Sequence, residues 1–229
     1  MEFLAAIRIA ARLELLLEWR SRGRLLAIFA FGILASVIAH YTLDPALLRQ
    51  PRNLAGSALG TLFFASLLLS GWAADAQDSS AYRLLLISPL DPAALYLARM
   101  FARWTALSAI CVAYVPANAV LLTGNFPTAA QAFAQLLVLL QVAWTLAALG
   151  SLFSAMLDQR GRGVALPVLI LPASIPALVL ASSSLERAFL TQIQFTGSGL
   201  AAMVAPAVLY STVGTLLFPF LYEDGPFTA

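Results

Sequence analysis

The chain has 229 residues, of which 61% are hydrophobic and only 10% are charged, and its mean hydropathy is +0.88. Because a soluble globular domain carries about 25% charged residues, this composition excludes a water-soluble fold. The net charge is +2, and all 13 basic residues are arginine. Without lysine, the chain cannot hold a GxxxxGK[ST] phosphate-binding loop or a Schiff-base lysine. One histidine and one cysteine also exclude an intrachain disulfide, a CxxC redox pair, a CxxCH haem-attachment motif and a structural zinc site.

The first 24 residues combine five arginines and three glutamates with many apolar side chains. On a helical wheel the charged residues occupy one half and most apolar residues occupy the other. This pattern predicts an amphipathic helix over 1–24 that lies in the membrane interface. The segment does not resemble a secretory signal peptide, because its charged stretch is too long and no small-residue cleavage site follows a short apolar core.

Six apolar runs follow, and a bilayer span needs about 20 apolar residues. No aspartate, glutamate or arginine lies well inside any of them. The sequence therefore predicts an all-α integral membrane protein in which 1–229 form a single transmembrane domain. Its predicted elements are the interfacial helix over 1–24 and six transmembrane helices at about 25–43, 54–74, 104–123, 132–157, 164–182 and 200–221.

The arginines are distributed unequally between the two sides that these spans define. Ten lie in 1–24, 75–103 and 158–162, whereas three lie in the connections on the opposite side. The positive-inside rule places the arginine-rich side in the cytoplasm. Because the number of spans is even, we expect a multi-pass protein of the bacterial inner membrane with both termini in the cytoplasm.

The connection over 75–103 is the longest cytoplasmic one and contains two helix start signals. Asp78 and the serines after it offer a helix N-cap, and Pro89 ends the short helix predicted over 79–87. Asp91, followed by proline, is a second start signal. We therefore expect a short helix across the inner surface, a break, and a second helix that continues into the third span.

The fifth span contains Pro167, Pro172 and Pro176. An interior proline removes a backbone hydrogen bond and frees the carbonyl four residues earlier. In hydrocarbon such a carbonyl must find another partner or line a wet cavity. Two interpretations remain open, a static kink and a hinge or pathway-lining segment.

Few side chains in the sequence favour catalysis or metal binding. His40, near the outer end of the first span, fits an interfacial polar residue better than a haem or metal ligand, and Cys111 fits a packing residue. Gly56 and Gly60 form a GxxxG pair that brings helix backbones together, either within the chain or between two copies. The lack of acidic residues and histidines at mid-membrane disfavours ion-coupled transport.

The order of these elements, without an ATP-binding motif, resembles the membrane subunit of an ABC exporter. Over nearly the whole chain it is similar to the CcmB family, the permease subunit of the cytochrome c maturation haem exporter. The similarity is best in three stretches, which are the acidic turn and leucine-rich helix of 75–99, the Arg-Gly repeat at 160–163 before the proline-containing fifth span, and 217–224. Where members commonly have Asp-Gly-Ser-Leu-Glu, this chain has Asp78-Ser-Ser-Ala-Tyr-Arg83, and it lacks the WWD motif of the haem-handling subunit.

The resemblance implies a non-catalytic permease in the lipid bilayer that works with a CcmA-like ABC ATPase, a CcmC-like haem-handling membrane subunit and a small membrane subunit. It is compatible with a homodimer and implies no nucleic acid partner. No cofactor is expected on this chain alone, and haem enters only at the level of the complex. The candidate ATPase-coupling residues are Asp75, Asp78, Arg83, Leu85, Ile87, Ser88 and Pro89. An ABC permease for a lipid, a polysaccharide or a drug, and a non-transporting assembly factor, are the alternative functions.

Overall fold

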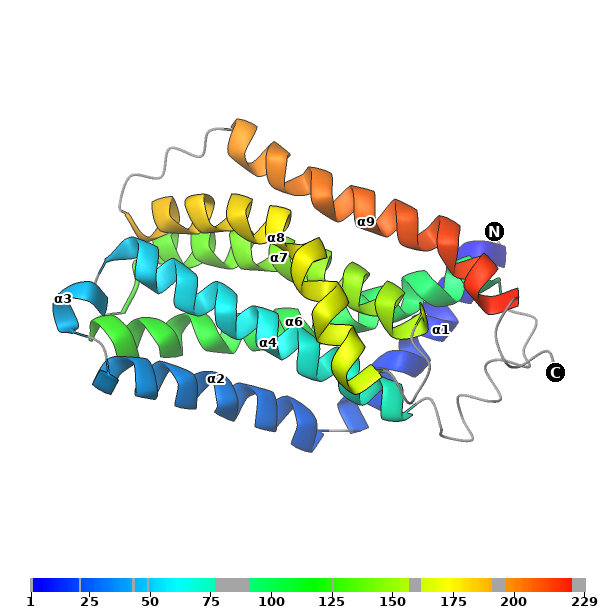
Figure 1. Ribbon diagram of the computed structural model, residues 1–229, viewed down its shortest axis with the longest axis horizontal. Coiled ribbons are helices and arrows are strands. Elements are labelled where there is room, and N and C mark those ends of the chain that lie inside the picture. The colour runs from blue at the N-terminus through cyan, green and yellow to red at the C-terminus, as the bar shows by residue number, and fades with distance from the viewer. Residues whose placement is uncertain are drawn as a thin grey trace.

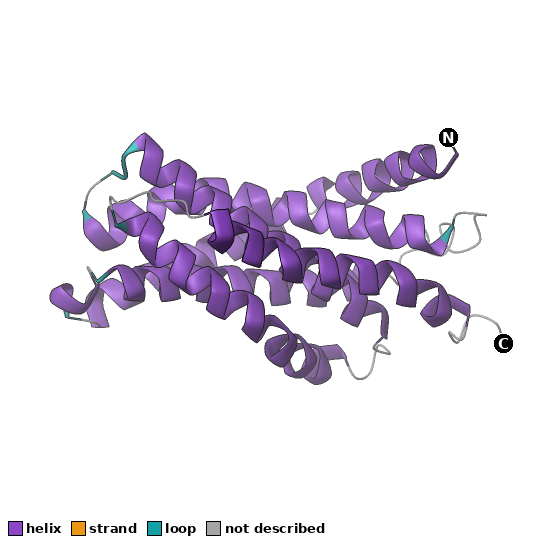
Figure 2. Ribbon diagram, turned by 90° about the horizontal axis from the view of Figure 1, so that it is seen from above, coloured by secondary structure: helices purple, strands orange, loops and turns teal. Residues whose placement is uncertain are grey.

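The computed structural model describes residues 2–20, 22–42, 44–48, 50–76, 91–124, 126–156, 162–190 and 197–223. Every regular element in these ranges is an α-helix, and the long helices run roughly along one axis (Figures 1 and 2). Six of them are long and apolar enough to cross a membrane. The predicted all-α membrane architecture is therefore confirmed. The beginning of α1 and the end of α9 lie at the same end of the bundle (Figure 1).

The N-terminal region forms two consecutive helices, as predicted, and the spans follow in order. The helices are α1 (Glu2–Arg20), α2 (Arg22–Thr42), the short α3 (Pro45–Leu48), α4 (Pro51–Ala76), α6 (Pro92–Thr123), α7 (Ala129–Met156), α8 (Arg162–Phe189) and α9 (Gly197–Glu223). The short α3 lies in a connection for which the sequence predicted no helix.

The helix that carries the third span begins at Pro92, as the start signal at Asp91 predicted. The predicted membrane-spanning part, at about 104–123, lies inside this longer helix. The Asp91 carboxylate accepts a hydrogen bond from the backbone N–H of Ala93 at 2.9 Å, and proline occupies the first helical position. At its other end α6 stops at Gly124, whose φ of 73° suits a residue without a side chain.

The fifth span ends later than predicted, because α8 continues to Phe189 through a run of three serines. These serines do not end the helix, since each hydroxyl donates to a carbonyl three or four residues earlier. The bonds run from Ser182 to Val179 at 2.8 Å, from Ser183 to Leu180 at 3.0 Å, and from Ser184 to Leu180 at 3.2 Å. Such back-bonding keeps a serine compatible with a helix interior.

The central helix of the bundle is α7, which packs against α4, α6, α8 and α9. Within the described residues 67% of its span is buried, compared with 18% for the peripheral α2. Its contact faces carry small residues that are fully buried, including Ala134, Ala143, Ala148 and Ser151. Because lipid tails are as apolar as leucine, close contact between small residues stabilises membrane helices more than hydrophobicity does.

A buried polar network attaches α2 to α4 and α6. The amide oxygen of Asn118 accepts hydrogen bonds from Ser36 at 3.0 Å and from Tyr114 at 3.1 Å, and the Tyr114 hydroxyl lies 3.1 Å from that of Thr61. Close approach here depends on Gly32, since a Cβ at this position would lie 3.0 Å from the Thr61 methyl group. Gly32 and Ser36, two small residues four positions apart, thus allow α2 to pack closely against its neighbours within the chain.

The GxxxG pair singled out in the sequence behaves differently. A Cβ built on Gly56 or Gly60 meets no described atom within 4 Å, and Gly56 is exposed. In the part of the chain that the structure describes, neither glycine therefore brings two helix backbones together.

Replacing Asn118 with leucine should lower the free energy of unfolding by about 1–2 kcal/mol, because two buried hydroxyl donors lose their shared acceptor. The measurement is SDS titration of the purified chain in mixed micelles. Val112→Leu, on the lipid-facing side of α6, is the control and should change stability little. Equal stabilities for the two variants would show that the network does not attach α2.

Candidate functional site

The predicted coupling residues fall largely outside the described part of the chain. Asp78, Arg83, Leu85, Ile87, Ser88 and Pro89 lie between 77 and 90, which the structure does not describe. Asp75 belongs to the last turn of α4. What the structure does describe is the start of α6 immediately after this segment, and this start carries two buried arginines.

Two arginines in the first three turns of α6 are buried within the bundle, each only 4% exposed. The Nε of Arg99 lies 3.3 Å from the Oε1 of Glu14 in α1. Arg103 donates hydrogen bonds to Ser151 at 3.3 Å and to Ser154 at 3.0 Å in α7. Both arginines belong to the helix that the Asp91 start signal predicted, and they are packed inside the bundle.

Tyr96, on the same helix, connects α6 to α7 and α9. Its hydroxyl group lies 3.2 Å from the carbonyl oxygen of Ala148 and 3.3 Å from that of Tyr210. Its ring packs at 5.6 Å on Phe218, over which the Arg99 guanidinium also lies at 5.7 Å. Gly214 faces this ring so closely that a Cβ there would overlap it.

The start of α6 is thus connected to α1 through Arg99, to α7 through Arg103 and to both α7 and α9 through Tyr96. A displacement of this helix end would act on three other helices at once. Sequence reasoning missed these residues, because neither a tyrosine nor an arginine near a helix start carries a signal of where it packs. The Asp91 cap predicted that Arg99 and Arg103 are helical but not that they are buried.

The three prolines lie inside α8, which remains a continuous helix and changes direction along its length (Figure 1). Pro172 and Pro176 are exposed, whereas Pro167 is partly buried. The hydroxyl of Tyr210 in α9 donates to the carbonyl oxygen of Ala173, between the two exposed prolines, at 2.7 Å. This carbonyl is not one of those that Pro172 and Pro176 free, which belong to Val168 and Pro172, so the bond attaches α9 to the proline segment without replacing the lost backbone bonds.

On the hinge interpretation, converting Pro172 and Pro176 together to alanine should leave abundance unchanged but lower several-fold the cytochrome c maturation that the resemblance to the CcmB family implies. Alanine restores both backbone donors and stiffens the segment, and substitutions at hinge positions often change turnover. Covalent haem attachment to a reporter cytochrome measures the effect. Pro116→Ala, at an exposed proline inside α6, should have no effect. Normal maturation in the double variant would identify a static kink.

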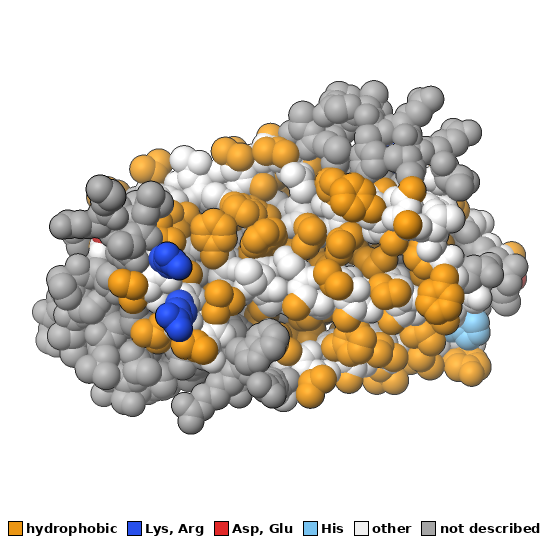
Figure 3. Space-filling view, turned by 180° about the vertical axis from the view of Figure 1, so that it is seen from behind, with side chains coloured by type: hydrophobic (Ala, Val, Ile, Leu, Met, Phe, Trp, Pro, Cys, Tyr) orange, Lys and Arg blue, Asp and Glu red, His pale blue; other side chains and the backbone are white. Residues whose placement is uncertain are grey.

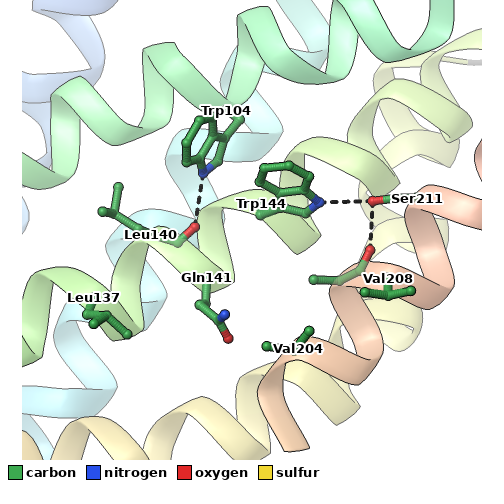
Figure 4. A pocket seen from close by; sticks show the side chains of 9 residues that line it. Trp104, Leu137, Leu140, Gln141, Trp144, Val204, Val208 and Ser211 are labelled. Carbon is green, nitrogen blue, oxygen red and sulfur yellow. Dashed lines mark hydrogen bonds between the residues drawn. The ribbon is translucent and has the colours of Figure 1, made fainter. Parts of the chain in front are cut away.

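A cavity of about 470 Å³ opens between α6, α7 and α9 (Figure 4). Its walls are mostly apolar and include two indole rings that meet edge to face at 5.1 Å. The lining residues are Trp104, Leu137, Leu140, Gln141, Trp144, Val204, Ala207, Val208 and Ser211. None of the three α8 prolines lines it.

The described surface differs between the two ends of the bundle and its middle. Hydrophobic side chains cover the middle of the face in Figure 3, while arginine side chains lie near one end and the histidine lies at the other. His40 is exposed, and its ring stands nearly perpendicular to that of Tyr41 at 5.4 Å. Among the described residues no group of three or more histidines, cysteines, aspartates or glutamates could hold a metal ion. Cys111 is buried in the core, as a packing residue would be.

These features define a six-span, all-helical membrane protein with an additional N-terminal helix packed on its third span. The CcmB family model, described as CcmB protein, matches residues 4–220, and the chain therefore belongs to the CcmB family. This membership makes it a membrane protein of the ABC transporter permease type that acts in haem export and cytochrome c biogenesis. A comparison with curated proteins returned no match.

Proposed function

We propose that this chain is the permease subunit of an ABC-type complex for haem handling in cytochrome c biogenesis, and that a separate CcmA-like subunit hydrolyses the ATP. The observation that carries the proposal is the family match over residues 4–220. The proposed complex also contains a CcmC-like haem-handling subunit and a small membrane subunit, with one or two copies of this chain.

Within this complex the chain transmits the energy of ATP hydrolysis and does not itself ligate haem. The segment 79–87, with its apolar run ending at Ile87, contacts the ATPase in this proposal. It is followed directly by α6, whose first turns are joined to α1 by Arg99 and to α7 by Arg103. Movement of the segment would therefore reach several spans through α6.

Purification of the tagged full chain in mild detergent tests the proposal. We expect an ATPase with a GxxxxGK[ST] loop, a WWD-containing membrane subunit and haem to co-purify with it. A tagged, unrelated six-span protein is the control. Recovery of the ATPase with lipid or polysaccharide and without haem would support an exporter of another cargo. Recovery without any ATPase would support an assembly factor.

We further propose that both termini face the cytoplasm of a bacterial inner membrane. In a Cys111→Ser background, single cysteines at Ser80 and Asp224 should not react with an impermeant thiol reagent in intact cells but should react after permeabilisation. Ala46→Cys, exposed on α3 at the opposite end, is the positive control. Efficient outside labelling at position 80 or 224 would reverse the orientation.

A further inference from the structure

The cavity between α6, α7 and α9 lies near the middle of the bundle and reaches its lipid-facing side. Trp144 is in the central part of α7, and Ser211 is in the central part of α9. At the mouth Val204 and Val208 are 39% and 56% exposed. With a volume of about 470 Å³, the cavity is within the range of about 300–1,000 Å³ that is typical of small-molecule sites.

Most polar groups in the cavity wall already have partners within the protein (Figure 4). The Trp104 indole N–H donates to the carbonyl oxygen of Leu140 at 3.1 Å, and the Trp144 indole N–H donates to the Ser211 hydroxyl at 2.9 Å. Ser211 in turn donates to the carbonyl oxygen of Ala207 at 2.7 Å. A ligand therefore meets these residues chiefly as apolar surfaces.

Gln141 is the exception. Its side chain extends into the space between α7 and α9 (Figure 4), and its Oε1 atom is buried with no hydrogen-bond partner among the described residues. An amide without a partner is costly in hydrocarbon. This atom is closed to a water-sized group as it lies, so a ligand hydroxyl reaches it only when the side chain turns into the cavity, and turning breaks no hydrogen bond of Oε1. A hydroxyl group can then satisfy either end of the amide because it both donates and accepts.

The same walls do not suit haem. Haem iron takes histidine, cysteine, methionine or tyrosine as axial ligands, and none of these residue types is among the described residues that line the cavity. The same described lining contains no arginine or other cation to pair with an anionic group. The chemistry thus selects a neutral molecule with an apolar body and a single polar group.

We propose that this cavity binds a neutral, lipid-borne molecule that carries a hydroxyl group, with Gln141 hydrogen-bonded to the hydroxyl and the two tryptophans packed on the apolar body. The molecule enters from the bilayer between Val204 and Val208. This binding is independent of the ATPase and of haem handling. An acylglycerol and a ring-bearing quinol share this chemistry, and competition between them identifies the source.

Fluorescence of the two cavity tryptophans provides the test. The full chain with Trp19→Phe and Trp72→Phe is reconstituted in phosphatidylcholine nanodiscs and titrated with bromoundecanol, whose bromine quenches indole. We expect saturable quenching above the linear background from lipid. Bromoundecane, which lacks the hydroxyl, should bind more weakly by about 2- to 10-fold, the range expected for one net hydrogen bond. Displacement of bromoundecanol by dioctanoylglycerol or by decylubiquinol then shows whether the natural ligand is an acylglycerol or a quinol.

Two variants probe the two parts of the site. Gln141→Leu should bind the alcohol and the alkane equally while keeping saturable quenching. Ala207→Phe, which fills the cavity, should remove the saturable component, whereas Ala113→Phe on the exposed side of α6 should not. If Ala207→Phe fails to fold, the binding of the alcohol and of the alkane to the parent chain and to Gln141→Leu still tests the proposal.

Three results would overturn the inference. Quenching that is only linear with bromoundecanol would show that nothing binds in the cavity. Equal binding of alcohol and alkane to the parent chain would show that Gln141 does not recognise a hydroxyl. Saturable quenching by haemin that is lost in Ala207→Phe would make the cavity a haem site.

Discussion

Replacing Gly214 with alanine should destabilise the protein by about 1–3 kcal/mol, the usual cost of overpacking a tight core. The new Cβ would overlap the ring of Tyr96, which is 0% exposed. The ring cannot move aside easily, because its hydroxyl lies within hydrogen-bonding distance of carbonyl oxygens of α7 and α9. SDS titration of the free energy of unfolding measures the loss.

Second-site variants at Tyr96 make this prediction specific. Tyr96→Phe keeps ring carbons that overlap the new Cβ, so it should not rescue Gly214→Ala. Tyr96→Leu removes them, and the double variant should lose less stability than the sum of the single variants. If the double variant instead loses as much stability as the two single variants together, the destabilisation by Gly214→Ala does not arise from its contact with Tyr96.

Two other glycines serve as matched controls for Gly214. At Gly150 the overlapping atom is only the Oγ of Ser70, at the end of a short side chain that can rotate, so Gly150→Ala should cost less. At Gly56 a Cβ meets no described atom, and Gly56→Ala should be neutral or should stabilise by up to about 1 kcal/mol through helix propensity. A large loss at Gly56 would instead indicate packing against a second copy.

Leu85→Asp and Ile87→Asp should each abolish co-purification of the ATPase and cytochrome c maturation, while the chain still inserts at normal abundance. Burial of one such side chain stabilises an interface by about 1.5–3 kcal/mol, and a buried, unpaired carboxylate adds a further penalty. Quantitative recovery of the ATPase with the tagged chain measures the first effect, and haem attachment to a reporter measures the second.

The control for these variants is Leu47→Asp, at an exposed leucine of α3 at the opposite end of the bundle. It introduces the same charge outside the proposed contact and should leave ATPase recovery unchanged. If the variants at 85 and 87 also retain wild-type recovery and maturation, the segment 79–87 only lies in the lipid interface.

The sequence by itself determined the number, kind and order of the membrane helices. Each span is recognisable because hydrocarbon requires a long apolar run whose backbone is satisfied within the helix. The sequence also predicted the start of α6, since the Asp91 cap and the proline after it act within one helical turn. These properties depend only on residues close together in the chain.

Only the tertiary structure decided which side chains meet. Gly56 belongs to a GxxxG pair and Gly214 to no recognised motif, yet of the two only Gly214 lies against another described helix. The burial of Arg99 depends on Glu14, 85 residues earlier. The cavity at Gln141 likewise needs α6, α7 and α9 together. In α7 and α9 the hydropathy is nearly the same on every face, so it does not determine the rotation of these helices. Close packing of small residues and a few buried hydrogen bonds determine it instead.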